Sequence, residues 1–70
     1  MRLTFCEIGK EVEVAGLCPS CAERRRLEDL GFVMGERIIP MRDSGGALVV
    51  AVKNSRIALN KALAQKILVK

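Results

Sequence analysis

Two cysteines, Cys18 and Cys21, are the residues best suited to chemistry in this sequence. They are followed at once by a short run of arginines, Arg24, Arg25 and Arg26. If a helix begins at the cysteines, its macrodipole and free N–H groups favour the thiolate form, and the nearby arginines add to that effect. A thiolate can ligate a metal ion or act as a nucleophile. The pair is therefore a candidate site for metal or redox chemistry.

Three interpretations of the cysteine pair stay open. A structural zinc site uses four nitrogen or sulfur ligands, but the chain has no histidine and only one further cysteine, Cys6. A complete shell would need a carboxylate, water or a second chain. Redox chemistry of the thioredoxin type belongs to a larger βαβ fold. The sequence thus favours incidental reduced thiols with no required cofactor, with zinc or iron at Cys18 and Cys21 as the alternative and redox chemistry third.

Enzymatic catalysis is not expected. The serines, Ser20, Ser44 and Ser55, have no histidine to activate them. The neighbouring carboxylates Glu28 and Asp29 point apart on a helix, so they are surface residues. We therefore expect a protein that is not an enzyme.

The composition favours one small folded domain. Seventy residues make a single domain over residues 1–70, and half of them are hydrophobic. Phe5 and Phe32 are the only aromatic residues, so the core must be aliphatic, and single-stranded nucleic acid has few faces to stack on. The net charge of +4 is mild, and charge alone does not distinguish nucleic acid, a membrane surface or an acidic protein as the partner. We expect no nucleic-acid partner, and a nucleic-acid-binding barrel that uses Arg24 to Arg26 is the weakest alternative. No apolar stretch is long enough for a membrane span and no signal peptide is visible, so a cytoplasmic location without membrane insertion is expected.

The first half of the chain predicts a turn, a strand and a helix. Thr4 and Glu7 have the form of a capping box, which predicts one helical turn ending at Gly9. Residues 11–15 alternate between polar and apolar, as in a half-buried strand with Val12 and Val14 facing inward. Residues 20–30 have apolar side chains at helical spacing and predict an amphipathic helix that Gly31 ends.

The rest of the chain predicts β structure. The expected strands are residues 36–42, 47–52, 56–59 and 67–69, with a glycine hairpin loop at residues 43–46 and a turn at residues 53–55. Pro40 marks an edge or a bulge, because proline cannot donate to a strand ladder. Asn60 is expected to cap a short turn over residues 61–65. About five short antiparallel strands with one inserted α-helix indicate a small mainly-β barrel.

The segment RLEDLGFVMGE, residues 26–36, closely resembles the central signature of the FeoA family. The glycines at 45 and 46, the apolar strand to Val52 and the residues near the end of the chain also resemble that family, so the resemblance covers residues 9 to 69. Met34 stands where the family usually has proline. The cysteine pair lies in a region that varies in the family, so the resemblance gives it no role.

The resemblance implies a fold and a partner. It implies an SH3-like β-barrel that acts as a cytoplasmic adaptor in ferrous iron uptake and contacts the cytoplasmic part of the FeoB permease. The same barrel resembles the C-terminal module of metalloregulators of the diphtheria-toxin-repressor type. A small metal carrier that uses the cysteines is the alternative function. The oligomeric state is not indicated.

The expected partner-binding surface is the helix and its exit. Arginines 24 to 26 fan over about 200° of a helix, so at least one must be exposed. Phe32 and Met34 follow the helix, and they either pack against the barrel or form an apolar patch beside the basic side chains. The candidate partner-binding residues are Arg24, Arg25, Arg26, Phe32 and Met34.

Overall fold

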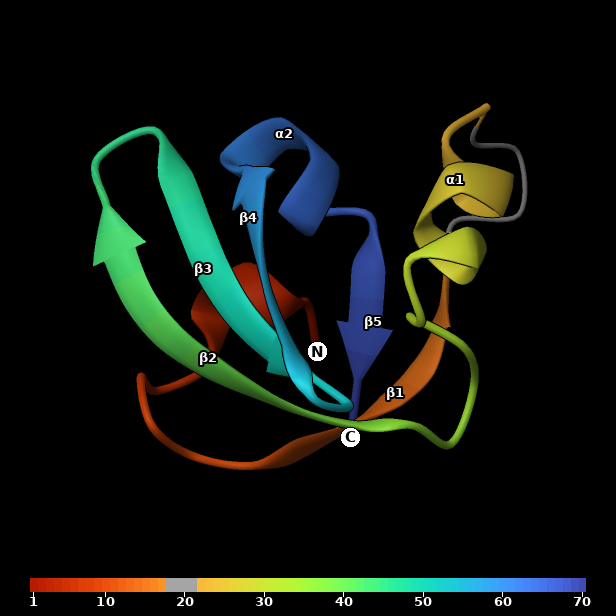
Figure 1. Cartoon of the computed structure of the whole chain (residues 1–70), viewed down its shortest axis with the longest axis horizontal. Helices are drawn as coiled ribbons and strands as arrows, with labels where there is room; N and C mark the ends of the chain where they lie inside the picture. Colours follow the sequence, from red (N-terminus) through yellow and green to blue (C-terminus); the bar gives the residue numbers. More distant parts are fainter. Residues whose placement is uncertain (18–21) are drawn as a thin grey trace.

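A computed structural model describes residues 1–17 and 22–70 of the chain. Over these residues it contains a 3₁₀ helix, five strands and two short α-helices (Figure 1). In chain order these are η1 (Leu3–Phe5), β1 (Val12–Leu17), α1 (Arg24–Asp29), β2 (Arg37–Ser44), β3 (Ala47–Val52), β4 (Ser55–Asn60), α2 (Lys61–Ala64) and β5 (Ile67–Val69). The predicted five strands, with a helix between the first two long strands, are confirmed.

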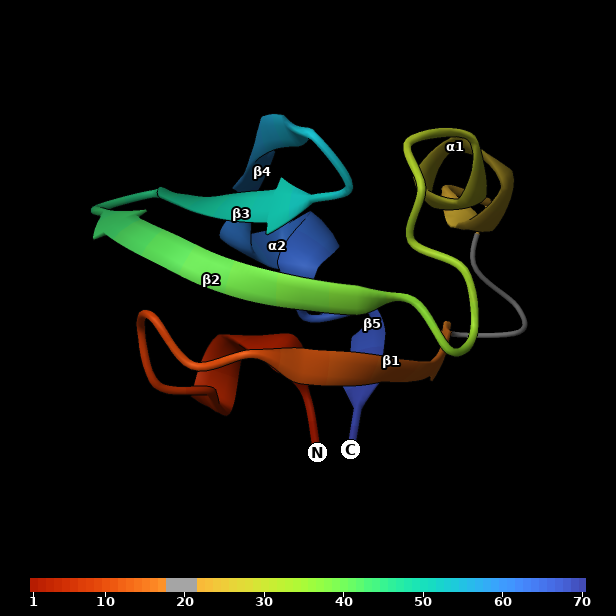
Figure 2. The same cartoon turned by 60° about the horizontal axis from the view of Figure 1, so that its bottom comes forward.

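The strands form one antiparallel sheet in the order β4-β3-β2-β1-β5. β1 is shared between two halves of this sheet: its first two residues pair with β2, and the residues from Val14 onward pair with β5. The register shifts between Val14 and Gly16. An irregularity of this kind bends a strand and increases its twist. The bend lets β1 leave β2 and continue beside β5, as the crossing ribbons in Figures 1 and 2 show.

A second irregularity lies at Pro40. β2 lies between β1 and β3, but β1 pairs only with its residues Arg37 and Ile38, so at Pro40 the strand has a strand partner on the β3 side alone. The register between β2 and β3 shifts between Pro40 and Arg42, which confirms the bulge. Pro40 is buried and still pairs with Val50, so the bulge follows it, and its missing N–H is tolerated because β1 does not pair with β2 at this residue.

The core is aliphatic apart from one aromatic side chain. Val12 and Val14 are buried, as the alternation in β1 predicts. The remaining buried hydrophobic residues come from η1, α1, α2, the turn after α1 and the other strands: Leu3, Leu27, Phe32, Ile38, Leu48, Val50, Val52, Leu59, Ala64, Ile67 and Val69. Every described element therefore contributes to one core.

Of the two predicted helix caps, one is confirmed and the other is wrong. The Asn60 side chain caps α2 as predicted, because its Oδ1 accepts a hydrogen bond of 2.8 Å from the Leu63 N–H. The capping box at Thr4 and Glu7 is wrong. η1 already begins at Leu3, and its N-cap Arg2 makes no side-chain cap. Burial of Leu3 in the core decides where this turn begins, so Thr4 lies inside it.

α1 is shorter than the predicted helix at residues 20–30. Its first helical residue is Arg24, Ala22 and Glu23 form a turn, and Ser20 lies outside the described residues. Leu27 is the one buried residue of α1, whereas Ala22 is exposed. Packing thus stabilises the turns around Leu27, and no apolar contact extends the helix to Ala22. None of the helices in the described ranges is long and apolar enough to cross a membrane.

The end of α1 has the hydrogen bonds of a Schellman motif. The Phe32 N–H donates to the Leu27 carbonyl at 3.0 Å, and the Gly31 N–H donates to the Glu28 carbonyl at 3.0 Å. Gly31 has a φ of 110°, in the region that favours glycine. This cap reverses the chain and brings Phe32 back toward Leu27, so that both side chains enter the core.

Replacement of Gly31 by alanine should destabilise the protein. A Cβ at this position would meet Val52 at 3.5 Å, an ordinary contact, so the cost comes from the backbone conformation. We expect Gly31→Ala to lower the free energy of unfolding by about 1–3 kcal/mol in urea denaturation. Gly46→Ala is the control, because a Cβ there meets nothing within 4 Å and its φ is not in the left-handed region. Equal stability of the two variants would contradict this account of the cap.

Candidate partner-binding site

The three arginines of α1 are all exposed, which confirms that the helix presents a basic face. The Arg24 Nε lies 3.5 Å from the Glu28 Oε2, one turn along the helix, and the Arg24 side chain is 49% exposed. Within the described residues no ion pair involves Arg25 or Arg26. Because exposed helix pairs of this kind contribute only about 0.3–0.5 kcal/mol, all three guanidinium groups are available to a partner at little cost.

Phe32 is not part of this exposed surface. Its side chain has no exposed area, so its place among the partner-binding residues is wrong. The Schellman motif turns Phe32 inward beside Leu27, where it becomes one of the largest fully buried side chains. The alternative interpretation, packing of the residue against the barrel, is the correct one. Phe32 is therefore a core residue beneath the exposed side chains of this surface.

Met34 is exposed, at 76%, and it lies just beyond the helix cap. The exposed fractions of Leu30 and Val33 are 37% and 40%, so three apolar side chains surround the exit of α1. Hydrogen bonds hold this exit loop on the barrel: the Gly35 N–H donates to the Val14 carbonyl at 2.8 Å, and the Val14 N–H donates to the Glu36 carbonyl at 2.9 Å. Met34 is therefore an exposed apolar side chain on a loop that β1 holds in place.

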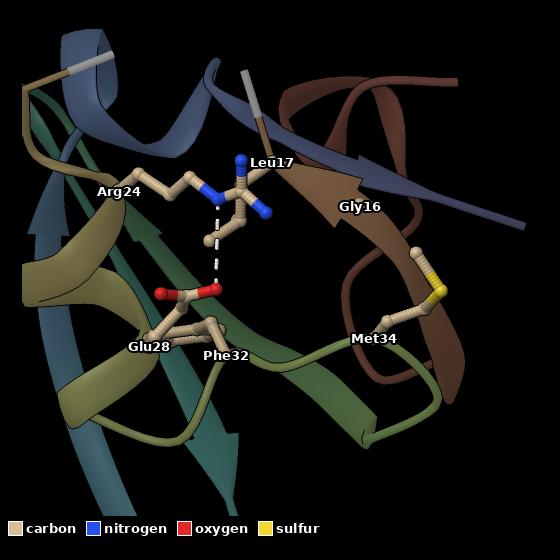
Figure 3. A pocket seen from close by; sticks show the side chains of 6 residues that line it. All are labelled: Gly16, Leu17, Arg24, Glu28, Phe32 and Met34. Carbon is tan, nitrogen blue, oxygen red and sulfur yellow. Dashed lines mark ion pairs between the residues drawn. The ribbon is translucent and has the colours of Figure 1, made fainter. Parts of the chain in front are cut away.

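A hollow of about 190 Å³ lies between α1 and β1 (Figure 3). In Figure 3 the Arg24 side chain extends from α1 toward the end of β1, with Glu28 paired to it, while Met34 lies beside β1. Small-molecule sites usually have about 300–1,000 Å³, so this hollow has the size for a side chain of a protein partner. Its lining residues are Gly16, Leu17, Arg24, Glu28, Phe32 and Met34.

The contributions of Gly16, Leu17 and Glu28 were not predicted from the sequence. Gly16 and Leu17 belong to the part of β1 that pairs with β5, and they line this hollow only because the fold brings β1 and α1 to the same place. No local pattern in the sequence marks such a contact. Glu28 was predicted to be a surface residue, which is correct, and its ion pair with Arg24 follows from helical spacing.

The whole chain matches a known protein family. The FeoA domain model matches residues 1–70. The chain belongs to the FeoA family. This family is associated with ferrous iron transport, and the resemblance seen in the sequence is confirmed.

Three relatives show how far the FeoA similarity extends. A protein from Methanocaldococcus jannaschii named as Fe(2+) transport protein A is 33% identical over 67 residues, which are 96% of this chain and 82% of that protein. The solution structure of a FeoA-like protein from Clostridium acetobutylicum is 28% identical with a TM-score of 0.91, covering 100% of this chain and 84% of that one. The zinc complex of Stenotrophomonas maltophilia FeoA, described as a prokaryotic SH3 domain protein, is 29% identical with a TM-score of 0.88, covering 100% and 89%. The fold is therefore SH3-like, as expected.

The three cysteines of this FeoA chain are its candidate metal ligands. Cys18 and Cys21, the predicted metal ligands, lie outside the described residues. Cys6 is half-buried, and its Sγ lies 3.8 Å from the Arg2 carbonyl oxygen, to which it donates. Burial raises the pKa of the Cys6 thiol, and the nearby N-terminal amine and Lys10 offset this only in part. Cys6 is thus mainly protonated at neutral pH and a poor metal ligand.

The described residues also lack a second source of ligands. No group of three or more histidine, cysteine, aspartate or glutamate side chains in residues 1–17 and 22–70 is arranged to hold a metal ion. A metal bound at Cys18 and Cys21 would therefore require water, a carboxylate or a second chain. Such an incomplete site is unlike the closed four-ligand sites on which small zinc domains depend.

We expect folding of the chain to be independent of metal, because buried side chains from every described element form one hydrophobic core. Wild type and Cys18→Ser/Cys21→Ser should give the same cooperative thermal melt by circular dichroism, with or without a chelator. Removal of a structural zinc site would instead abolish the folded baseline. Loss of that baseline in the double variant, or in wild type with chelator, would mean that the cysteines form a structural metal site.

Proposed function

We propose that this chain is a non-enzymatic cytoplasmic adaptor that assists ferrous iron uptake by binding the cytoplasmic part of a FeoB-type permease. Membership of the FeoA family, with its association with ferrous iron transport, carries the proposal. The Stenotrophomonas maltophilia relative has been put forward as a bacterial ferrous iron transport activating factor. An accessory role of this kind needs a surface for a protein partner and no reaction centre.

The residues of the chain support a binding role over catalysis. The sequence has no histidine, so its serines have no imidazole base. Ser44 and Ser55 are exposed strand residues beside turns, where a small polar side chain is expected for structural reasons. Neither of these serines therefore has the histidine base that a serine nucleophile uses.

The surface that fits the adaptor role comprises Arg24, Arg25, Arg26 and Met34, which we call the α1 face. Arginine and methionine are enriched at protein interfaces relative to the rest of the surface. An apolar anchor surrounded by cations suits a partner with an apolar side chain among carboxylates. The hollow between α1 and β1, with Met34 at its rim, supplies the depression in which such a side chain can bind.

Charge reversal on the α1 face should weaken permease binding without unfolding the protein. We expect Arg25→Glu/Arg26→Glu to bind the purified cytoplasmic domain of the permease about tenfold more weakly, or worse, in calorimetry. The matched control is Arg42→Glu/Arg56→Glu, which makes the same change of net charge at exposed positions on β2 and β4. Circular dichroism checks that both variants are folded.

Two outcomes would contradict this assignment of the surface. If the Arg25→Glu/Arg26→Glu variant binds normally, the α1 face is wrong, and the hairpin loop at Ser44, Gly45 and Gly46 becomes the next candidate. If both double variants lose binding equally, the effect is one of net charge and not of a defined surface.

The zinc complex of the Stenotrophomonas maltophilia relative favours one alternative, a small metal carrier that uses Cys18 and Cys21. The Cys18→Ser/Cys21→Ser variant distinguishes an adaptor from a metal carrier. An adaptor retains permease binding when both cysteines are replaced by serine. A carrier retains its folded state but loses zinc or ferrous iron in equilibrium dialysis under reducing conditions.

A further inference from the structure

The two edges of the sheet differ in whether the chain covers them. β4 and β5 are the outer strands of the sheet. The start of the chain covers the edge of β5, because Arg2 forms a bridge with Leu68 and the Val69 N–H donates to the Met1 carbonyl at 2.7 Å. No segment of residues 1–17 or 22–70 pairs in this way with the outer side of β4, which lies beyond β3 at the border of the sheet (Figure 2). One edge is therefore covered and the other is open.

The register of β3 and β4 identifies the backbone groups that face the open edge. In an antiparallel ladder, opposite residues alternate between pairs that exchange hydrogen bonds and pairs that do not. The Lys61 N–H donates to the Gly46 carbonyl at 3.1 Å, and the ladder continues from this bonded pair without a shift. Counting back along β4, Ile57 belongs to a bonded pair, whereas Arg56 and Ala58 do not. The N–H and C=O groups of Arg56 and Ala58 thus point away from β3.

The open edge lacks the usual protection against an added strand. Proteins commonly protect such edges with a proline, a bulge or a very short strand. β4 has six residues without proline, and all of them pair with β3 without a register shift. Arg56 and Ala58 are both exposed, and within the described residues no turn or loop segment bonds to their backbone groups. β4 therefore offers accessible donors and acceptors to a further strand.

The charges along this edge are positive. β4 and the turn before it contain Lys53 and Arg56 but no acidic residue. Within the described residues, neither of the two cations is in an ion pair. Lys53 has a φ of 55°, in the left-handed region that favours glycine, so a lysine is kept there at a conformational cost. Two unpaired cations beside open backbone groups suit an anionic partner.

We propose that the open edge of β4 binds an extended, acidic segment of a partner protein, which joins the sheet as a further strand. The edge selects an extended backbone, because only a strand can bond to Arg56 and Ala58 together. Arg56 selects acidic side chains, because opposite charges stabilise cross-strand pairs.

Other occupants match the edge less well. Two copies of the chain, each with a net charge of +4, repel each other. A bilayer or a nucleic acid attracts cations but has no peptide groups for the strand. The inference goes beyond the proposed function, because it assigns a second partner to a surface other than the α1 face.

The first experiment follows amide hydrogen exchange by NMR. In the free protein, the amides of Arg56 and Ala58 should exchange rapidly and that of Ile57 slowly, because only the Ile57 N–H bonds to β3. The probe is a blocked peptide of alternating threonine and glutamate, about ten residues long, which carries all its carboxylates on one face of a strand. At millimolar concentration it should slow exchange at Arg56 and Ala58. A matched peptide of alternating threonine and lysine should not.

The second experiment removes one outward donor. Ala58→Pro deletes an N–H that does not bond to β3, and edge strands tolerate proline where the N–H faces solvent. We expect this variant to bind the acidic peptide about tenfold more weakly, or not at all. Ala58→Thr is the matched control, because it changes the same side chain but keeps the N–H, and it should bind like wild type. Circular dichroism checks that both variants are folded.

The third experiment tests the charges without a change of backbone donors. Arg56→Ser should weaken binding of the acidic peptide about twofold to fivefold. Lys53→Gly should also weaken it, while the midpoint of urea denaturation rises because glycine fits the left-handed φ. A lysine with a purely structural role would not combine these two effects.

Four results would overturn the proposal. Exchange at Arg56 and Ala58 could be unchanged by the acidic peptide, or both peptides could bind equally. Binding could survive in folded Ala58→Pro, which would place the peptide elsewhere. Self-association of wild type that Ala58→Pro abolishes would make a second copy the occupant. Ala58→Pro should bind the permease domain like wild type, so failure of this proposal leaves the proposed function untouched.

Discussion

The hydrogen bond from the Phe32 N–H to the Leu27 carbonyl reverses the chain at the end of α1, and the position of the proposed partner-binding surface depends on that reversal. It sends Phe32 into the core beside Leu27, which attaches one side of a very short helix to the barrel. The other side of α1 is left to solvent with its arginines. The reversal also leads the chain into the loop that holds Met34 exposed next to β1. The cap is possible because Gly31 tolerates a φ of 110°.

Much of the fold could be predicted from the sequence because its signals are local. Alternation in β1 identified Val12 and Val14 as inward-facing, and Asn60 was recognised as a cap because a side-chain amide before a helix satisfies a free N–H. The order of turn signals gave five strands and an inserted helix. Resemblance to the FeoA family then indicated that the strands close into an SH3-like barrel, which the pattern of a single strand does not show.

The rest depended on tertiary contacts that sequence patterns do not contain. Phe32 was named with the partner surface because it follows the helix, but the helix cap turns its side chain inward. Gly16 and Leu17 line the same hollow as Arg24 and Glu28 only because β1 leaves β2 and continues beside β5. Phe5 is the converse case: it is a large apolar residue, yet it is exposed, while Leu3 in the same turn is buried. The exposure of the arginines could thus be predicted from the sequence, whereas the hollow between α1 and β1 could not.

Iron uptake by the cells that produce this chain is the most direct test of whether it assists a ferrous iron permease. The measurement is the initial rate of uptake of radiolabelled ferrous iron, under reducing conditions, in cells that retain the permease but lack this chain. We expect the rate to fall without the chain, to recover with wild type or with the cysteine double variant, and not to recover when the α1 face carries reversed charge. An uptake rate that is the same with and without the chain would contradict the account.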